Sequence, residues 1–500
     1  MSDQPATEHR EAQSGLDPWN RADLPAPPMP RGLGWIGVVG PGVIVLGMSI
    51  GSGEFLLGPA AFVSYGFAIL WITTIAVFLQ TIFNLELMRY TLATGEPAFT
   101  GFMRTRPNST FWAWFYVVLY FLQMGWPAWA GNAAAAIFLL STQRLPDPAD
   151  GNVVYGIAAG TFVFCVLVLF IGRRIERTLE LLNWILIVFI LGAFLVLALM
   201  YASPATWLAA GAGFVGYDTA SGGFSFLPAG ADYFLLGALA AYSGCGGVGN
   251  ITLTNWARDK GYGMSQITGY IPALVGGQKV NLAHTGSTFN PTEESLGRWR
   301  GWWRIIKADQ WAVFFAGAML GMVLPALLYV TFLPRGSEIR GIGIGASLAH
   351  AMAGKVGALA GGAVAFMGAW ILLKTQLDII EGMTRAITDI LWTSNKRLRE
   401  WRGGDVRVVY YSVLGATVVW GVIALRLAQP IVLLQLGANM AGIVFIISSI
   451  HILYVNTTLL PKELRPSIWR RGALIGMALF YGFFVVLWIR SMILAGLTVT

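Results

Sequence analysis

Residues 40–62 read GPGVIVLGMSIGSGEFLLGPAAF, and this stretch decides the class of fold. It is almost wholly apolar and long enough for a helix that crosses the ~30 Å hydrocarbon core of a bilayer. Its centre nevertheless carries Gly51, Ser52, Gly53 and then Glu54. A glycine costs ~1 kcal/mol in a helix interior relative to alanine, and a carboxylate near the bilayer centre costs at least ~2.5 kcal/mol on insertion scales. The stretch therefore predicts an interrupted membrane helix with a functional carboxylate.

A second stretch of the same kind is AAYSGCGGVGNITLTNWARD, residues 240–259, in which Asn250 follows a run of glycines. Unwound backbone at membrane depth is tolerated only where it lines a cavity or is buried in protein. Paired interrupted helices at corresponding places in two halves indicate the central site of a secondary transporter. The alternative interpretation is close helix packing, because small residues let backbones approach.

The whole chain has the composition of a membrane protein: 56% of its residues are hydrophobic and 12% are charged, about half the charged fraction of soluble domains. We therefore expect an all-α integral membrane protein with about eleven transmembrane helices of ~20 residues each. The predicted segments are 35–64, 67–93, 111–141, 153–172, 178–201, 232–256, 309–333, 356–380, 408–425, 430–454 and 472–494.

The distribution of basic residues predicts the orientation of these segments. With the N-terminus inside, 24 of the 33 Lys and Arg residues fall in cytoplasmic stretches and six in external ones, as the positive-inside rule requires. A multi-pass protein of the cell membrane with an external C-terminus follows. Because the basic residues lie in short loops, the net charge of +8 reflects topology, and no nucleic-acid partner is expected.

Two polar segments flank this domain or interrupt it. Residues 1–33 are rich in Pro and Ala without an apolar run behind a basic start, which predicts a disordered cytoplasmic tail ahead of a transmembrane domain at 34–500. The longest connection, 258–307, ends in RWRGWWRIIK. Interleaved Trp and Arg predict a short helix lying at the lipid headgroups.

The ionisable residues inside the apolar segments allow more than one interpretation. Glu54 is a candidate cation ligand or proton carrier, or else half of a structural ion pair. Lys374 and Asp378 are four residues apart and can pair locally, with Lys374 snorkelling; the alternative is a fixed Lys374 cation that faces Glu54. Cys245 could be a soft metal ligand, although a small buried thiol is commoner. The histidines show no metal-ligand spacing, and no phosphate-binding or nucleophile motif occurs, so we expect neither an enzyme nor a bound cofactor.

The first segment resembles the Nramp (natural-resistance-associated macrophage protein) divalent-metal transporters. In that family GPG is followed, after eight residues, by the metal-binding DPGN; here Gly40-Pro41-Gly42 is followed at the same interval by Gly51-Ser52-Gly53-Glu54. Further similarities lie in LQTIFNLELMRYTLATG (79–95), GRRIERTLELLNW (172–184) and IVLLQLGANMAGIVF (431–445). The resemblance implies a LeuT-type fold of two inverted five-helix repeats, about 34–201 and 232–455, with broken helices 1 and 6 and an extra helix at 472–494.

The chain departs from this family at the metal site itself. The family's metal-binding Asp and Asn of helix one fall on Gly51 and Glu54, and its MPHN of helix six falls on Gly247 to Asn250, so only Asn250 survives. The acidic proton pathway of helix three has no counterpart, since 111–141 contain no Asp or Glu. A site without the thioether loses its preference for softer metals, and one carboxylate with carbonyls suits a hard ion such as Mg²⁺.

We therefore expect a secondary transporter that moves a divalent cation, Mg²⁺ or Mn²⁺, by alternating access as a symporter. Glu54 and Asn250 are the candidate metal ligands, and Glu54 and Lys374 the candidate coupling residues. The alternative is an ion-coupled permease for a small organic solute such as an amino acid, because glycine-exposed N–H groups can hold a carboxylate. A scaffold or receptor is disfavoured, since it has no need of unwound helices. The expected substrate-binding residues are Gly51, Ser52, Gly53, Glu54, Ser243, Gly246, Gly247, Asn250 and Gln435.

Overall fold

The computed structural model describes residues 14–170, 175–271, 282–337 and 344–498 as an almost entirely helical protein. Within these ranges nine helices are long and apolar enough to cross a membrane. These spans are Pro41–Tyr65, Phe67–Thr94, Pro148–Val168, Arg177–Tyr201, Glu293–Phe332, Ala358–Ser394, Val406–Ala424, Pro430–Thr458 and Ile468–Leu494. The prediction of an all-α membrane fold is confirmed.

Two other predicted segments each form a pair of shorter helices. Segment 111–141 consists of α7 (Ser109–Met124) and α8 (Ala128–Thr142). Segment 232–256 consists of α12 (Tyr233–Tyr242) and α13 (Val248–Lys260), so helix six is broken as predicted. The break at Gly125–Pro127 was not predicted; Pro127 there lacks the N–H that a continuous helix would use.

Helix one differs from the prediction because it is not unwound. It runs from α3 (Pro41–Ser49) through the π-helix η1 (Ile50–Leu57) into α4 (Gly58–Tyr65). A π-helix keeps its backbone hydrogen bonds but widens the turn, and such turns are frequent at functional sites. Helix one is therefore widened where helix six is broken.

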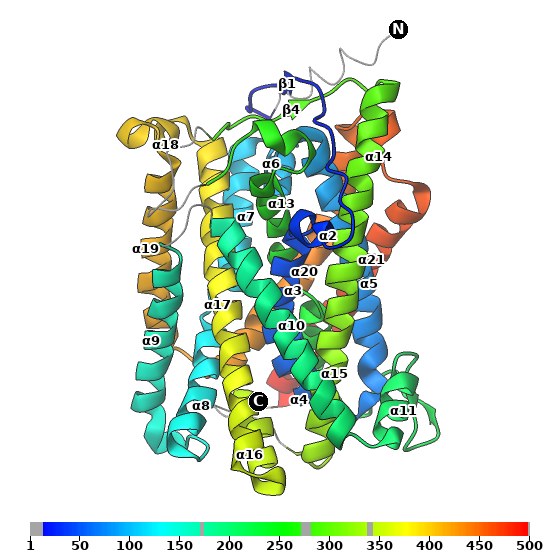
Figure 1. Ribbon diagram of the computed structural model, residues 1–500, viewed down its shortest axis with the longest axis vertical. Coiled ribbons are helices and arrows are strands. Elements are labelled where there is room, and N and C mark those ends of the chain that lie inside the picture. Colours follow the sequence, from blue (N-terminus) through cyan, green and yellow to red (C-terminus); the bar gives the residue numbers. More distant parts are fainter. Residues whose placement is uncertain (1–13, 171–174, 272–281, 338–343, 499–500) are drawn as a thin grey trace.

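The two glycine-rich helices occupy the middle of the bundle. All residues in the apolar central stretch of helix one are buried inside the protein, whereas only 33% of those in Pro148–Val168 and 22% of those in Arg177–Tyr201 are buried. Figure 1 shows α3 in the interior, with α9 (Gly151–Val168) and α19 (Val406–Ala424) at one side.

The remaining elements connect or flank these helices. They are α2 (Gly34–Val38), η2 (Phe67–Ile69), α5 (Leu70–Thr94), α6 (Ala98–Met103), η3 (Pro148–Asp150), α10 (Ile175–Tyr201), α11 (Pro204–Gly213), β2 (Tyr217–Asp218), β3 (Gly223–Phe224), η4 (Gly263–Ile267), α16 (Ile344–Val356), α17 (Ala358–Ser394), α18 (Lys396–Glu400), η6 (Trp401–Gly403), α20 (Pro430–Thr458), η7 (Lys462–Leu464) and α21 (Ile468–Thr498).

The predicted headgroup helix at residues 298–307 is wrong. These residues belong to α14 (Glu293–Ala308), which continues through the π-helix η5 (Asp309–Phe315) into α15 (Ala316–Phe332), and Figure 1 shows α14 standing in line with α15. The Trp and Arg side chains of α14 hold another part of the chain, because Arg298 donates to the Leu24 carbonyl (2.7 Å) and Trp302 to the Pro25 carbonyl (2.8 Å).

That part is the N-terminal segment, where the prediction of a disordered tail fails for residues 14–33. Strand β1 (Asn20–Arg21) pairs in parallel with β4 (Ser287–Thr288), and Arg104 donates to the Asp17 carbonyl over 2.9 Å. A polar, Pro-rich sequence has no core of its own, but here its backbone groups are satisfied by the strand and by arginines of the helical domain. Residues 1–13 lie outside the described part of the chain.

Candidate functional site

Glu54 lies in the π-helix η1 and has 0% exposure to solvent. Neither of its carboxylate oxygens has a hydrogen-bond partner among the described residues, and none of the ion pairs found there includes it. The Ser49 hydroxyl and the Gly244 amide lie nearby without reaching hydrogen-bonding geometry. A buried charge without a partner is costly, and among the described residues Glu54 does not form the structural ion pair that was its alternative interpretation.

The break in helix six lies beside this carboxyl group and is built from left-handed glycines. Gly244, Gly246 and Gly247 have φ of 107°, 82° and 46°, values that favour glycine because other residues clash there. These three left-handed residues, within a stretch of four, end α12 and precede the start of α13 at Val248. The prediction that the glycine cluster unwinds helix six is confirmed.

Two glutamines from neighbouring helices bind the peptide groups that the break leaves free. Gln80 of α5 donates to the Ser243 carbonyl over 2.7 Å. Gln123 of α7 donates to the Gly246 carbonyl and accepts from the Val248 amide, both over 2.9 Å. These bonds satisfy backbone groups that would otherwise be buried without partners, and they hold the break in one conformation.

Helix one meets this break through its own glycines. A Cβ atom at Gly53 would overlap the Tyr242 carbonyl oxygen, and one at Gly51 would overlap the Thr375 hydroxyl of α17. Ser52 accepts a hydrogen bond from Trp129 over 2.9 Å. In helix one, then, the small residues permit close packing, which was the alternative interpretation of the glycine pattern.

The GPG sequence at the start of helix one binds a carboxylate that the sequence analysis did not single out. Asp309 of η5 is completely buried and accepts hydrogen bonds from the amides of Gly40 (2.9 Å) and Gly42 (2.8 Å). A Cβ atom at Gly42 would lie 2.7 Å from the Asp309 carboxylate. The free amides of a helix N-terminus attract a negative charge, so Asp309 fixes the first turn of helix one.

A chain of buried amide side chains connects Asp309 with the break in helix six. Gln310 donates to Asp309 (2.8 Å), Asn84 donates to Gln310 (2.9 Å), and Asn250 donates to Asn84 (2.9 Å). The carbonyl oxygen of Asn250 has no partner among the described residues. Polar side chains inside apolar spans were the signal that could have found Asn84, whereas Asp309 stood at the edge of a predicted segment.

Lys374 lies in α17 and forms the predicted local pair. Its ammonium group is 2.7 Å from the Asp378 carboxylate and also donates to the Asn183 carbonyl oxygen. The residue is 4% exposed, so it does not snorkel. A Cβ atom at Gly47 would overlap the ammonium group, which places Lys374 against helix one, but the described ion pairs of Lys374 do not include Glu54.

Gln435, expected among the substrate-binding residues, is half-buried on α20. Its backbone carbonyl accepts a hydrogen bond from Asn439 over 2.9 Å, and within the described ranges no hydrogen bond joins its side chain to the other candidates. Gly437, two residues further on, packs closer: a Cβ atom there would lie 3.1 Å from the Tyr242 hydroxyl. Ser243, also a candidate, lies in the break and hydrogen-bonds Thr73 (3.0 Å).

A cavity of about 740 Å³ lies outside this site, at the start of helix one. It is bordered by residues 26–28, by α10 and by the end of α13. Lys260 pairs there with Glu180 over 2.5 Å and donates to the Val39 carbonyl over 3.2 Å. Glu54 and Asn250 are not among its lining residues, and both have 0% exposure, so the central site is closed to solvent in this conformation.

In sequence comparisons no protein-family model matches the chain, and no curated protein matches it. Solved structures do match. A histidine-to-alanine variant of a manganese transporter from Eremococcus coleocola superposes with a TM-score of 0.65 at 15% identity, over 93% of this chain and 89% of that one. A glutamate-to-glutamine variant gives the same TM-score over 95% and 90%, and a complex with an aromatic bis-isothiourea substituted compound gives 0.58 at 16% identity, over 91% and 88%.

This chain shares the fold of that transporter. The likeness covers nearly all of both chains, so the resemblance seen at residues 40–62 is confirmed at the level of fold. The likeness shows the fold, while the chemistry of the site depends on the residues described above.

Proposed function

We propose that this chain is a secondary transporter that moves a metal cation across the membrane. The observation that carries the proposal is Glu54, completely buried beside the break in helix six with both carboxylate oxygens unpartnered among the described residues. A resting structural carboxylate would be paired, because burial of an unpaired charge is costly. The fold shared with a manganese transporter supports the same conclusion.

The donors that Glu54 and Asn250 offer are hard oxygen atoms. Glu54 supplies a carboxylate, and Asn250 supplies a carbonyl oxygen whose own amide is held by Asn84. We infer that these two, with backbone carbonyls of residues 51–53 and 244–247, bind a divalent ion such as Mg²⁺ or Mn²⁺, which favour carboxylate, carbonyl and water ligands. Partial hydration would complete the coordination.

Alternating access requires the closed site to open in turn to each side. We propose that the inner closure is the start of helix one, held by Asp309 and by the Lys260–Glu180 pair, with the N-terminus cytoplasmic. Proton coupling belongs to Glu54, which binds either a proton or the metal. Lys374 is the second candidate, since its ammonium group packs against Gly47 of helix one and loss of its proton would weaken its pair with Asp378 on α17.

A permease for a small organic solute is the second candidate function. The observation in its favour is that the described residues contain no group of three or more His, Cys, Asp or Glu side chains placed so that they could hold a metal ion. In that case the left-handed glycines of the break would hold a substrate carboxylate through their N–H groups.

Uptake of Mn²⁺ into proteoliposomes tests the proposal. We expect Glu54→Gln, which keeps the shape but removes the charge, to lower the initial rate at least tenfold, while Glu294→Gln, at an exposed position of α14, leaves it unchanged. Size-exclusion profiles show whether each variant is folded. Metal uptake that is equal in wild type and Glu54→Gln, or amino-acid uptake that persists in EDTA, would reject the metal site.

A further inference from the structure

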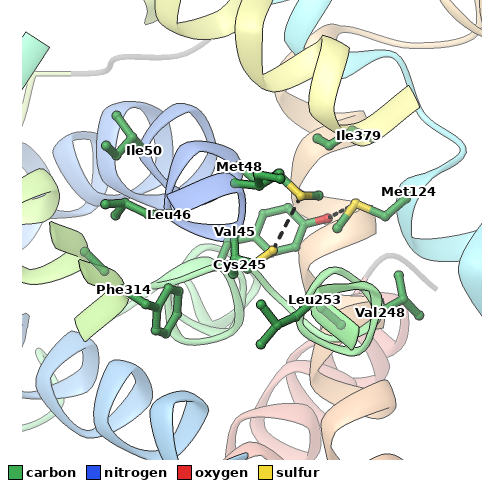
Figure 2. Close-up of a cluster of buried hydrophobic side chains, with 14 of the residues drawn as sticks. Val45, Leu46, Met48, Ile50, Met124, Cys245, Val248, Leu253, Phe314 and Ile379 are labelled. Atoms are coloured by element: carbon green, nitrogen blue, oxygen red, sulfur yellow. Dashed lines mark hydrogen bonds between the residues drawn. The ribbon is translucent and has the colours of Figure 1, made fainter. Parts of the chain in front are cut away.

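Three sulfur-containing side chains from three different helices meet next to the break in helix six (Figure 2). Met48 comes from α3, Met124 ends α7, and Cys245 lies within the break. All three are buried, with exposures of 1%, 3% and 1%. The sulfur atoms of Cys245 and Met48 are 3.8 Å apart.

Gly249 provides independent evidence that the three side chains converge on one point. A Cβ atom at Gly249 would lie 2.5 Å from the Cys245 sulfur, 3.2 Å from the Met124 methyl group and 3.5 Å from the Met48 methyl group. Three residues far apart in sequence thus border the same small volume next to Gly249. A larger side chain at position 249 would occupy that volume.

Within the described part of the chain, the hydrogen bonds of these sulfur atoms are weak. The Cys245 thiol donates to the Met48 sulfur, and the Tyr242 hydroxyl donates to the Met124 sulfur over 3.9 Å. Both are weak hydrogen bonds, and methionine has three rotatable bonds with which to reorient. The cluster can therefore exchange its internal contacts for a ligand.

We propose that Met48, Met124 and Cys245 form a binding site for a thiophilic monovalent cation of the Cu(I) class. Two sulfur donors on a metal at about 2.3 Å, separated by a tetrahedral angle, would be about 3.8 Å apart, which is the observed distance between Cys245 and Met48. Thioether and thiolate donors select soft ions such as Cu(I).

The charge of the site favours a monovalent cation. When the metal binds, the Cys245 S–H bond breaks, a sulfur–metal bond forms, and the proton leaves to solvent. The monovalent cation thus takes the place of the proton, so the net charge of the site and the oxidation state of the metal stay the same. The surroundings are apolar, as the labelled side chains Val45, Leu253 and Phe314 in Figure 2 show. A divalent ion would add a net charge to this low-dielectric volume.

The experiment is a competition titration of the purified full-length protein in detergent with the Cu(I)–bicinchoninate complex under argon. We expect one Cu(I) per wild-type chain and at least a hundredfold weaker binding in Met48→Leu/Met124→Leu/Cys245→Ser. X-ray absorption of the wild-type complex should show sulfur neighbours of copper at about 2.3 Å, and this measurement requires no variant to fold.

Matched controls separate this site from other sulfur atoms and from the proposed transport site. Cys165→Ser and Met477→Leu, both at buried positions elsewhere in the bundle, should bind Cu(I) as the wild type does, and so should Glu54→Gln. Equal binding by the wild type and the triple variant, or a copper coordination shell without sulfur, would overturn the proposal. Loss of Mn²⁺ transport in Glu54→Gln with unchanged Cu(I) binding would leave it intact.

Discussion

Helices one and six are both rich in glycine at their centres, yet only helix six breaks. In helix six Gly244, Gly246 and Gly247 adopt positive φ. In helix one Gly51 and Gly53 stay within the π-helix η1. Glycine removes the steric obstacle to unwinding in both places, so composition alone does not decide between the two outcomes.

The neighbours of each helix account for the difference. Side-chain amides from α5 and α7 bind the peptide groups that helix six exposes. Around helix one, the space next to Gly51 and Gly53 is filled by a hydroxyl group and by the Tyr242 carbonyl of helix six itself. A glycine-rich helix thus unwinds where partners for its backbone are available, and it packs closely where they are not.

The largest effect on stability is expected from Gly53→Ala, which tests the close packing of helix one against helix six. The new methyl group would overlap a backbone carbonyl oxygen that cannot move without shifting helix six. We expect a loss of about 3 kcal/mol in the free energy of unfolding, the upper end for overpacking, measured as a lower melting temperature by tryptophan fluorescence in detergent. Gly160→Ala is the control, because no described atom lies within 4 Å of its added Cβ. Equal melting temperatures for the two variants would contradict the packing role of Gly53.

The next largest effect should come from Gln123→Leu, which removes both bonds to the break in helix six. Each buried group left without a partner costs about 1–3 kcal/mol, so we expect a loss of about 2 kcal/mol or more. The exposed Gln429→Leu serves as the control. If thermal unfolding of the two variants is the same, the glutamines do not stabilise the break.

Asp309→Ala tests whether helix one is anchored at its start rather than at its centre. It leaves the amides of Gly40 and Gly42 without their acceptor, and a loss of about 2 kcal/mol is expected. Asp309→Asn keeps one acceptor oxygen and should retain about half of that stability. Thermal melts of the three proteins should therefore fall in order, and an asparagine variant as unstable as the alanine variant would contradict this explanation.

Much of this architecture could be predicted from residue patterns that depend only on the local chain. Apolar length identified the spans, and four glycines near Asn250 identified the break in helix six. The charge of Glu54 in an apolar stretch identified a residue that lies fully buried beside that break. Each of these signals is contained within one segment.

What could not be predicted depends on contacts between distant segments. Tyr242 and Thr375 pack against the π-helix of helix one, and the N-terminal segment is held by Arg104 and α14. Met48, Met124 and Cys245 likewise meet only because three separate helices bring them together. The resemblance selected Gln435, whereas the structure places Gly437 of the same helix against Tyr242.

The smallest expected effect concerns Gly51, whose added Cβ would meet a side-chain hydroxyl rather than backbone. Gly51→Ala should lower the free energy of unfolding by about 1–2 kcal/mol, because the Thr375 side chain can move only partly away from the added methyl group. In a Thr375→Ala background, where the obstructing oxygen is absent, the same change should cost about 1 kcal/mol less, a coupling expected of residues in contact. A double-mutant cycle on melting temperatures measures this difference. An equal cost in both backgrounds would mean that Gly51 is required by the π-helix itself, so that the widened turn of helix one would arise from its own sequence.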